Sequence, residues 1–292
     1  MKDHFNKGLL LTSMGSFWWG FIGVIYFESV SFIGHTELVV HRCLWTAIML
    51  ILTTTFLSKW KIFLKISKNK NILVSLFISG FLIFVNWAVW IYAVASERII
   101  DASFGYFIMP IISVLLGYIF FKEELNTKRI FSIFLVIISI LILIFFNYKS
   151  LPWVGIIVAL SWAFYNLVRK KIDIDTDIGL LIESLYILPF ALCAFYLIYK
   201  NGFNDFNFSN PGLSLVLIFA GPMTVIPLFL YVRGVELIGL GPTGMIFYIT
   251  PTFQFILGYF YYNEEFSFIK FLSFIIIWIA VIIYIKDLYE TN

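Results

Sequence analysis

The stretch that decides the fold is residues 80–125, GFLIFVNWAVWIYAVASERIIDASFGYFIMPIISVLLGYIFFKEEL, because the chain contains it twice. With one constant offset and no gaps, it aligns with residues 221–266, GPMTVIPLFLYVRGVELIGLGPTGMIFYITPTFQFILGYFYYNEEF. The matches include Gly80 with Gly221, Pro110 with Pro251, Gly117-Tyr118 with Gly258-Tyr259, and Glu123-Glu124 with Glu264-Glu265. Glycine, proline and glutamate do not match by composition alone, so the alignment predicts an internal repeat.

The composition indicates a membrane protein with several spans. Of the 292 residues, 61% are hydrophobic and only 13% are charged, and the mean hydropathy is +0.96. These values lie outside the usual range of soluble domains. The first apolar run is followed by further spans and by no cleavage site, so we expect a retained helix. Cys43 and Cys193 are isolated in apolar runs, which favours packing over redox or metal chemistry.

Hydropathy predicts an all-α integral membrane protein with ten transmembrane helices of about 20 residues each. The expected spans are 8–27, 36–57, 72–94, 103–121, 128–146, 152–169, 178–198, 212–232, 242–261 and 267–285. Five spans fall in each copy of the repeat. We therefore expect two domains, a first repeat at 1–149 and a second at 150–292.

The distribution of Lys and Arg predicts the orientation. One side of the spans takes Lys2, Lys7, Lys59, Lys61, Lys65, Lys68, Lys70, Lys122, Lys128, Arg129, Arg169, Lys170, Lys171, Arg233 and Lys286. The other side takes only Arg42, Arg98, Lys149, Lys200 and Lys270. This asymmetry predicts that both termini are cytoplasmic. Because each repeat holds an odd number of spans, the second must be inverted relative to the first, an arrangement typical of secondary transporters.

Small and polar residues follow one face of the fourth and ninth expected spans. The two stripes are Ser103, Tyr106, Pro110, Ser113 and Gly117, and Gly244, Phe247, Pro251, Gln254 and Gly258. Such a stripe must face protein or water rather than lipid. Pro110 and Pro251 each remove a backbone donor and bend the helix, so they are candidate hinges. The stripes predict a central cavity, with close helix packing as the alternative.

The candidate substrate-binding residues combine aromatic faces with polar groups. Aromatic rings would hold an apolar or cationic part of a solute, while amides and hydroxyls would orient its polar end. Asn86 needs a partner in mid-span, which could equally be another helix. The candidates are Trp19, Asn86, Trp90, Ser103, Tyr106, Tyr165, Tyr248 and Gln254.

Ionisable residues inside the spans are candidates for coupling a proton to transport. Glu37 and His41 are spaced four residues apart next to Arg42, and Glu183 lies one turn into the seventh span. The alternative for Glu37, Arg42 and Glu183 is a structural role, in which Glu37 pairs with Arg42 or both side chains extend to the membrane interface. Arg233 could contact an anionic substrate or simply obey the charge rule. The two Glu-Glu pairs could latch the ends of the protein or be solvated.

Several familiar motifs are absent or out of context. The stretch 239–244 fits GxGxxG, but it follows a membrane span rather than a soluble strand. The sequence has no P-loop, HExxH or CxxC motif, and its histidines lack zinc-ligand spacing. We therefore expect no metal, no cofactor, no nucleic-acid partner and no enzymatic activity.

The sequence resembles the RarD group of EamA-type permeases in the drug/metabolite transporter superfamily, over nearly its whole length. The resemblance rests on Glu37-Leu-Val-Val-His41-Arg42-x-x-Trp45, Asn86-Trp87, Ala102-Ser103-x-Gly105-Tyr106-Phe107-Ile108-x-Pro110, Phe164-Tyr165, Val168-Arg169-Lys170-Lys171, Ile182-Glu183, Ala220-Gly221-x-x-Thr224-x-x-Pro227-Leu228 and Tyr248-Ile249-x-Pro251-Thr252. It implies ten helices in two inverted five-helix repeats, a central cavity and a bacterial inner-membrane location. Two positions depart from the family: Phe247 stands where Gln is common, and Arg233 where residues are small.

These patterns together predict a secondary-active permease that moves a small organic solute, an amino acid, metabolite or drug-like compound, by alternating access. Its expected partners are the solute, membrane lipids and a coupling proton, and both a monomer and a homodimer remain open. The rival hypotheses are a non-transporting assembly protein and a passive channel. A membrane enzyme is disfavoured because the ionisable residues are few and scattered.

Overall fold

The computed structural model describes residues 2–95, 99–147, 153–207, 209–261 and 267–291, with side chains described for all of these except 2, 91, 94, 95, 99–104 and 147. Within these ranges the secondary structure is helical and includes no strand. The elements are α1 (Lys2–Phe17), the π-helical segment η1 (Trp18–Ile22), α2 (Gly23–Ser29), α3 (His35–Phe56), α4 (Trp60–Ile66), α5 (Lys70–Ala95), α6 (Ile99–Phe121), α7 (Thr127–Asn147), α8 (Trp153–Lys171), α9 (Thr176–Lys200), α10 (Pro211–Ile218), α11 (Ala220–Ile238), α12 (Leu240–Ile246), α13 (Ile249–Phe260) and α14 (Phe268–Thr291).

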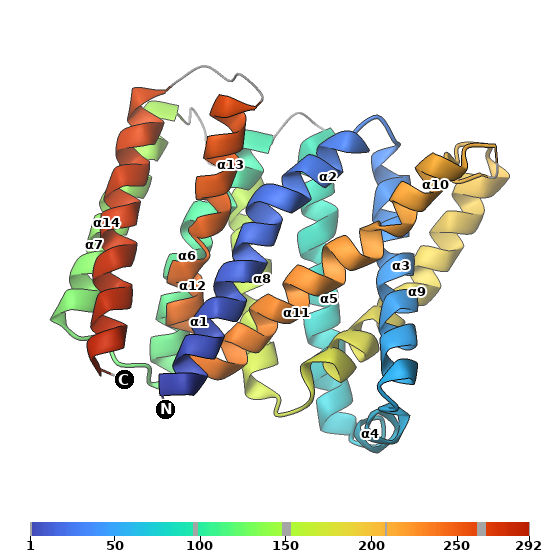
Figure 1. Cartoon of the computed structure of the whole chain (residues 1–292), viewed down its shortest axis with the longest axis horizontal. Helices are drawn as coiled ribbons and strands as arrows, with labels where there is room; N and C mark the ends of the chain where they lie inside the picture. Colours follow the sequence, from blue (N-terminus) through green and yellow to red (C-terminus); the bar gives the residue numbers. More distant parts are fainter. Residues whose placement is uncertain (1, 96–98, 148–152, 208, 262–266, 292) are drawn as a thin grey trace.

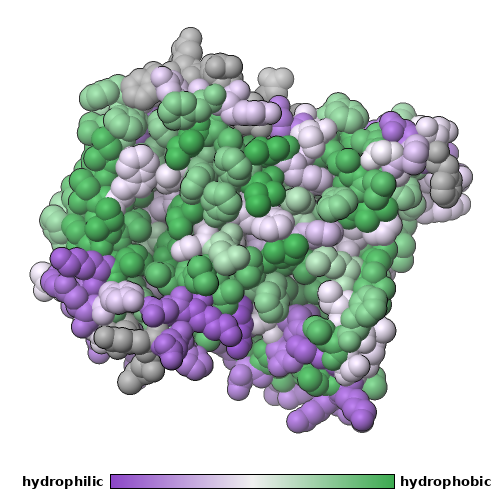
Figure 2. Space-filling model, in the orientation of Figure 1, coloured by the Kyte–Doolittle hydropathy of each residue, from purple (hydrophilic) through white to green (hydrophobic). Residues whose placement is uncertain are grey.

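Seven helical segments in the described ranges are long and apolar enough to cross a membrane. They are Asp3–Ser29, His35–Phe56, Lys70–Trp90, Thr127–Phe146, Thr176–Lys200, Pro211–Ile238 and Phe268–Thr291, and Gly105–Phe121 is a shorter apolar helix. A broad apolar belt covers the visible face, and hydrophilic surface gathers along the lower edge in Figure 2. Both termini lie at this edge (Figure 1). The prediction of an all-helical, multi-pass membrane protein is confirmed.

Helices far apart in the sequence pack side by side. Helix α1 packs on α11, α8 packs on both α5 and α6, and α12 and α13 pack on α6 and on the α1–η1 segment. Helix α3 packs on α9, and α7 packs on α14 (Figure 1). The largest buried apolar cluster draws side chains from both halves of the chain, so the core lies between them.

Several of the long helices are interrupted near their middle. The π-helical turn η1 separates α1 from α2, and the pair Phe247-Tyr248 separates α12 from α13. Gly20 lies in η1 against the Thr250 backbone, where a Cβ atom would approach the Thr250 carbonyl oxygen to 2.6 Å. π-helical turns carry one extra residue and occur often at functional sites. The α1–α2 segment and the α12–α13 segment are thus both irregular where they touch.

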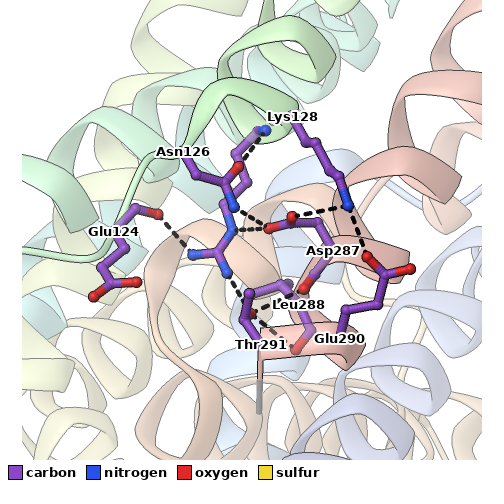
Figure 3. A network of polar contacts seen from close by, with 8 residues as sticks. Glu124, Asn126, Lys128, Asp287, Leu288, Glu290 and Thr291 are labelled. Carbon is purple, nitrogen blue, oxygen red and sulfur yellow. Dashed lines mark hydrogen bonds and ion pairs between the residues drawn. The ribbon is translucent and has the colours of Figure 1, made fainter.

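A buried ion pair joins α7 to the end of α14 (Figure 3). The Nε atom of Arg129 donates to Asp287 at 2.8 Å, and its Nη atoms donate to the Glu124 carbonyl and the Thr291 hydroxyl. Asn126 donates to the same Asp287 oxygen at 2.7 Å. Arg129 and Asp287 are 6% and 3% exposed, so this pair is shielded from water. The network fixes the two chain segments against each other at the lower edge.

Breaking this pair should destabilise the protein. In Asp287→Asn the Arg129 guanidinium loses its buried counter-charge, which typically costs about 3–5 kcal/mol. We expect a clear drop in the thermal midpoint of the purified protein in detergent. The matched control is Glu290→Gln, which removes the exposed Lys128–Glu290 pair at the same helix end and should leave the midpoint unchanged. Equal midpoints for the two variants would contradict this role of the buried pair.

Candidate functional site

Six aromatic side chains meet between the two halves of the chain, and we call them the central aromatic cluster: Trp19, Tyr106, Trp162, Tyr165, Tyr231 and Phe247. The ring centroids of Trp19 and Trp162 are 5.1 Å apart, edge to face. Those of Tyr231 and Phe247 are 5.5 Å apart, also edge to face. Ring pairs at these separations add stabilisation to that gained from the burial of their apolar surface. The cluster therefore holds the two halves together through contacts between flat aromatic rings.

The irregular helices position this cluster. Trp19 lies in the π-helical turn, and Phe247 lies at the break between α12 and α13. Tyr106 precedes the helix-bending Pro110 by one turn. Tyr106 and Phe247 align with each other in the predicted repeat, and their ring centroids are 5.8 Å apart. Two residues that align in the sequence thus touch at the centre of the molecule.

A small cavity lies between α3, α5, α9 and α11. Its volume is about 20 Å³, and its lining includes Thr46, Trp87, Glu183 and Ser184. A cavity of this size holds about one water molecule, provided that polar partners are present. The lining supplies such partners, so the cavity suits a bound water better than an organic solute.

Glu183 belongs to a buried polar network that reaches the lower edge. It accepts hydrogen bonds from the hydroxyls of Ser79 and Tyr165, and its Oε1 lies 3.7 Å from Arg169 Nη1. Arg169 is 1% exposed and also lies 3.9 Å from Glu236. Glu236 in turn binds the Thr176 hydroxyl and Arg233.

Arg169 is the network residue that the sequence analysis missed. A basic residue at the end of a helix is usually a solvated interfacial charge. Here the guanidinium is buried because Gly179 of α9 leaves room for it; a Cβ atom at Gly179 would collide with Arg169 Nη1. Nothing local in the sequence signals this contact between α8 and α9.

The alternative in which Glu37 pairs with Arg42 is wrong, because the two side chains have other partners. Glu37 accepts hydrogen bonds from the backbone N–H groups of Asp205 and Phe206 and from His41. Arg42 donates from Nε to the Thr224 hydroxyl at 3.0 Å. Its guanidinium lies 4.5 Å from the Trp87 ring centroid. Glu37 therefore ties α3 to the loop between α9 and α10, while Arg42 ties α3 to α11.

The first Glu-Glu pair supplies a cap for α12. Glu123 accepts hydrogen bonds from the N–H groups of Leu240 and Gly241 at 2.7 and 2.8 Å. Burial raises the pKa of the Glu123 carboxyl, while these two N–H groups act in the opposite direction. Gly239 has φ +94°, a conformation that favours glycine and that directs the two N–H groups towards the carboxylate. The GxGxxG-like stretch is therefore a helix start that binds Glu123, which fits the latch alternative. The second pair, Glu264-Glu265, lies outside the described residues.

The structure brings together only some of the predicted substrate-binding residues. Trp19, Tyr106 and Tyr165 lie in the central aromatic cluster. The Asn86 amide donates to the Val158 carbonyl at 2.9 Å and to a hydroxyl of the same helix, so it joins α5 to α8.

The remaining predicted residues lie elsewhere. Trp90 packs beside Phe27, and Tyr248 donates to the Phe107 carbonyl at 2.7 Å within a separate apolar cluster. Gln254 is half-buried on α13, and the Ser103 side chain lies outside the described residues. The candidate hinges Pro110 and Pro251 are both buried. Trp162 and Tyr231, which the sequence analysis omitted, are central instead.

Similarity to known proteins indicates the family to which the sequence is related. The model of the EamA-like transporter family matches residues 6–145 and again 150–286. The uncharacterized transporter YojE of Bacillus subtilis is 33% identical over 283 residues, which cover 96% of this chain and 93% of YojE. Protein RarD of Escherichia coli is 30% identical over 287 residues, covering 98% and 96%. A crystal structure with 11% sequence identity superposes with a TM-score of 0.71 over 96% of this chain and 97% of that chain, which shows a shared fold. The resemblance to the RarD group is confirmed.

The contact between Gly179 and Arg169 can be tested by one added methyl group. In Gly179→Ala the new Cβ atom would overlap a guanidinium that is buried and cannot move into solvent, and overpacking of this kind costs about 1–3 kcal/mol. We expect a lower thermal midpoint in detergent. Gly212→Ala is the matched control, because its Cβ would meet only Asn210 Oδ1 at 3.8 Å. An unchanged midpoint for Gly179→Ala would show that α8 and α9 do not pack as described.

Proposed function

The chain belongs to the EamA-like transporter family, and on that premise we propose that it is a secondary-active permease that moves a small organic solute by alternating access. The observation that carries the proposal is the central aromatic cluster, which both halves of the chain build. Tyr106 and Phe247, equivalent in the two copies, are in ring contact there. A site on the axis between two such halves can be reached from either side of the membrane as they rock against each other. The family and the relatives indicate a transporter rather than an enzyme.

We further propose ten transmembrane helices in two inverted repeats, at 1–149 and 150–292. The packing supports this, because exchanging the halves leaves the neighbours unchanged. The contact of α1 with α11 corresponds to that of α8 with α5, while α3–α9, α6–α12 and α7–α14 each pair equivalent helices. The hydrophilic lower edge with both termini agrees with cytoplasmic termini in a bacterial inner membrane (Figure 2).

In this proposal the solute separates the rings of the central aromatic cluster. The broken helices at η1 and at Phe247-Tyr248 and the hinges Pro110 and Pro251 allow the halves to bend around it. The cap of Glu123 on α12 and the ion pairs of Lys59 with Asp175 and Asp177, at 3.1 and 2.8 Å, hold the inner end closed. Both sets of contacts must break when the protein opens inward.

Removing one ring of the cluster should impair transport. The solute is first identified by a thermal-shift screen of amino acids, amines, nucleosides and drugs, and counterflow is then measured in liposomes. We expect Tyr106→Ala to lower counterflow at least about tenfold, because a shared aromatic contact is lost. Phe260→Ala, which removes an exposed ring at the end of α13, is the control and should transport normally. Normal counterflow by Tyr106→Ala would remove the cluster from the transport path.

We propose Glu183 as the carrier of a coupling proton. Its Oε2 accepts from the Tyr165 hydroxyl of the cluster at 3.3 Å, and its network continues through Arg169 to Glu236 at the lower edge. A buried carboxylate that touches the cluster is placed to bind and release a proton as the solute binds and leaves. Arg169 stays protonated, so it positions Glu183 and does not itself carry the proton.

Two flux measurements, pH-gradient-driven accumulation and solute counterflow, distinguish a role of Glu183 in proton coupling from a role in solute binding. Glu183→Gln cannot release a proton, so we expect pH-gradient-driven accumulation to be lost while solute counterflow continues. The thermal midpoint and counterflow of this variant report that the protein is folded. Accumulation equal to that of the parent protein would exclude Glu183 as the proton carrier.

A further inference from the structure

Three arginines are buried in the described part of the chain, and two of them have carboxylates beside them. Arg129 pairs with Asp287 at 2.8 Å. Arg169 lies 3.7 and 3.9 Å from two glutamates. Arg42 is the exception, since no carboxylate of the described residues lies within 4 Å of it, although its side chain is only 8% exposed.

The surroundings of Arg42 orient its guanidinium without neutralising it. Nε donates to the Thr224 hydroxyl, which itself donates to the Ala220 carbonyl at 2.8 Å and is thereby fixed. The guanidinium lies over the rings of Trp87 and Phe27, at 4.5 and 5.3 Å. Thr224 is thus a positioning residue, and the two ring faces stabilise the cation only by their quadrupoles.

Most of the hydrogen-bonding capacity of Arg42 is unused by the described residues. A guanidinium has five N–H donors, and the bond from Nε to Thr224 uses one of them. Both Nη groups remain available, and they form the fork that matches a carboxylate through two parallel hydrogen bonds. A buried cation that is held only by ring faces and one hydroxyl carries an uncompensated desolvation penalty. An anion that reaches the site would remove that penalty.

The site adjoins the proposed transport path. The Arg42 guanidinium lies on the ring of Trp87, with 4.5 Å between the guanidinium carbon and the ring centroid. Trp87 packs in the same apolar cluster as Trp162 and Phe247. The nearest carboxylate in the sequence, Glu37, is occupied by backbone N–H groups and His41. A ligand at Arg42 would therefore meet aromatic surface on one side and one positive charge on the other.

We propose that Arg42 binds the carboxylate of the transported solute, so that the solute is an organic monocarboxylate with an apolar or aromatic body. This inference rests on the proposed permease function and names the substrate class of that site. The anion accepts hydrogen bonds from the two Nη groups in the plane of the guanidinium, while the Trp87 and Phe27 rings stay against its faces. The body of the solute lies against the central aromatic cluster. A single guanidinium suits one negative charge, whereas a phosphate dianion would call for a second cation.

The test uses a matched set of probes on the full-length protein in nanodiscs. Phenylacetate, phenylpyruvate and indole-3-acetate are compared with phenylacetamide, indole-3-acetamide, phenethylamine and tryptamine, which keep the ring and replace the carboxylate. Equilibrium binding is measured for the parent protein, Arg42→Gln, Arg42→Lys and Thr224→Val. Lys200→Gln is the control for a positive charge lost at the same end of the molecule without contact to the site; Lys200 is exposed at the end of α9.

We expect at least one carboxylate to bind the parent protein and its amide and amine analogues to bind at least about 30-fold more weakly, the loss typical of an unpaired buried charge. Arg42→Gln should abolish this preference. Arg42→Lys should retain part of the preference for carboxylates, because lysine keeps the positive charge but lacks the two Nη groups that bind both carboxylate oxygens. Thr224→Val should weaken the preference, and Lys200→Gln should leave it unchanged.

Two results would overturn the inference and keep the permease. The first is equal binding of carboxylates, amides and amines by the parent protein. The second is binding of no carboxylate in the set while a neutral or cationic solute shows saturable counterflow in liposomes. Absence of counterflow for every solute tested would overturn both proposals together. If Arg42→Gln does not fold, as judged by its thermal midpoint, the comparison of carboxylates with amides on the parent protein still decides the question.

Discussion

The burial of charge in a medium that cannot solvate it is the constraint on which this structure depends. Ionised side chains are tolerated inside a membrane protein only beside partners, and the partners here come from distant segments of the chain. Asp287 of α14 compensates Arg129 of α7, and backbone N–H groups at 205–206 bind Glu37 of α3. Each contact fastens one part of the chain to another. Arg42 lacks such a carboxylate among the described residues, which makes it the place where an external anion fits.

The apolar interior complements these fixed charges with a surface that can rearrange. The rings of the central aromatic cluster meet one another through ring contacts worth about 0.5–1.5 kcal/mol per pair beyond their burial, which is less than the cost of breaking a buried ion pair. Helix irregularities coincide with this cluster: the π-helical turn carries Trp19, and the break between α12 and α13 carries Phe247. Polar contacts such as the Glu123 cap lie at the end of the molecule instead. The proposed alternating access requires both features: apolar contacts at the centre that can separate, and polar contacts at the ends that hold the protein closed.

The sequence predicted the membrane class and the family, and it singled out some rings of the central aromatic cluster, because these depend on local or repeated patterns. Tyr106 lies in the repeated stretch and Tyr165 in a family motif, so both could be found from the sequence. Trp162 and Tyr231 could not, since nothing distinguishes them from the many other aromatic residues of an apolar chain until helices from both halves pack. The burial of Arg169 depends on Gly179 of the following helix. The predicted Glu37–Arg42 pair fails because distant N–H groups and Thr224 bind these side chains more closely than they bind each other.

The central claim is that the two halves of the chain cross the membrane in opposite senses. It can be tested in a protein whose Cys43 and Cys193 are replaced by alanine, with a single cysteine at Glu124 or at Phe260, both of which are exposed. A membrane-impermeant maleimide is applied to right-side-out and inside-out vesicles. The account predicts that the cysteine at 124 reacts only from the cytoplasmic face and the cysteine at 260 only from the opposite face. Reaction of both cysteines from the same face would contradict it.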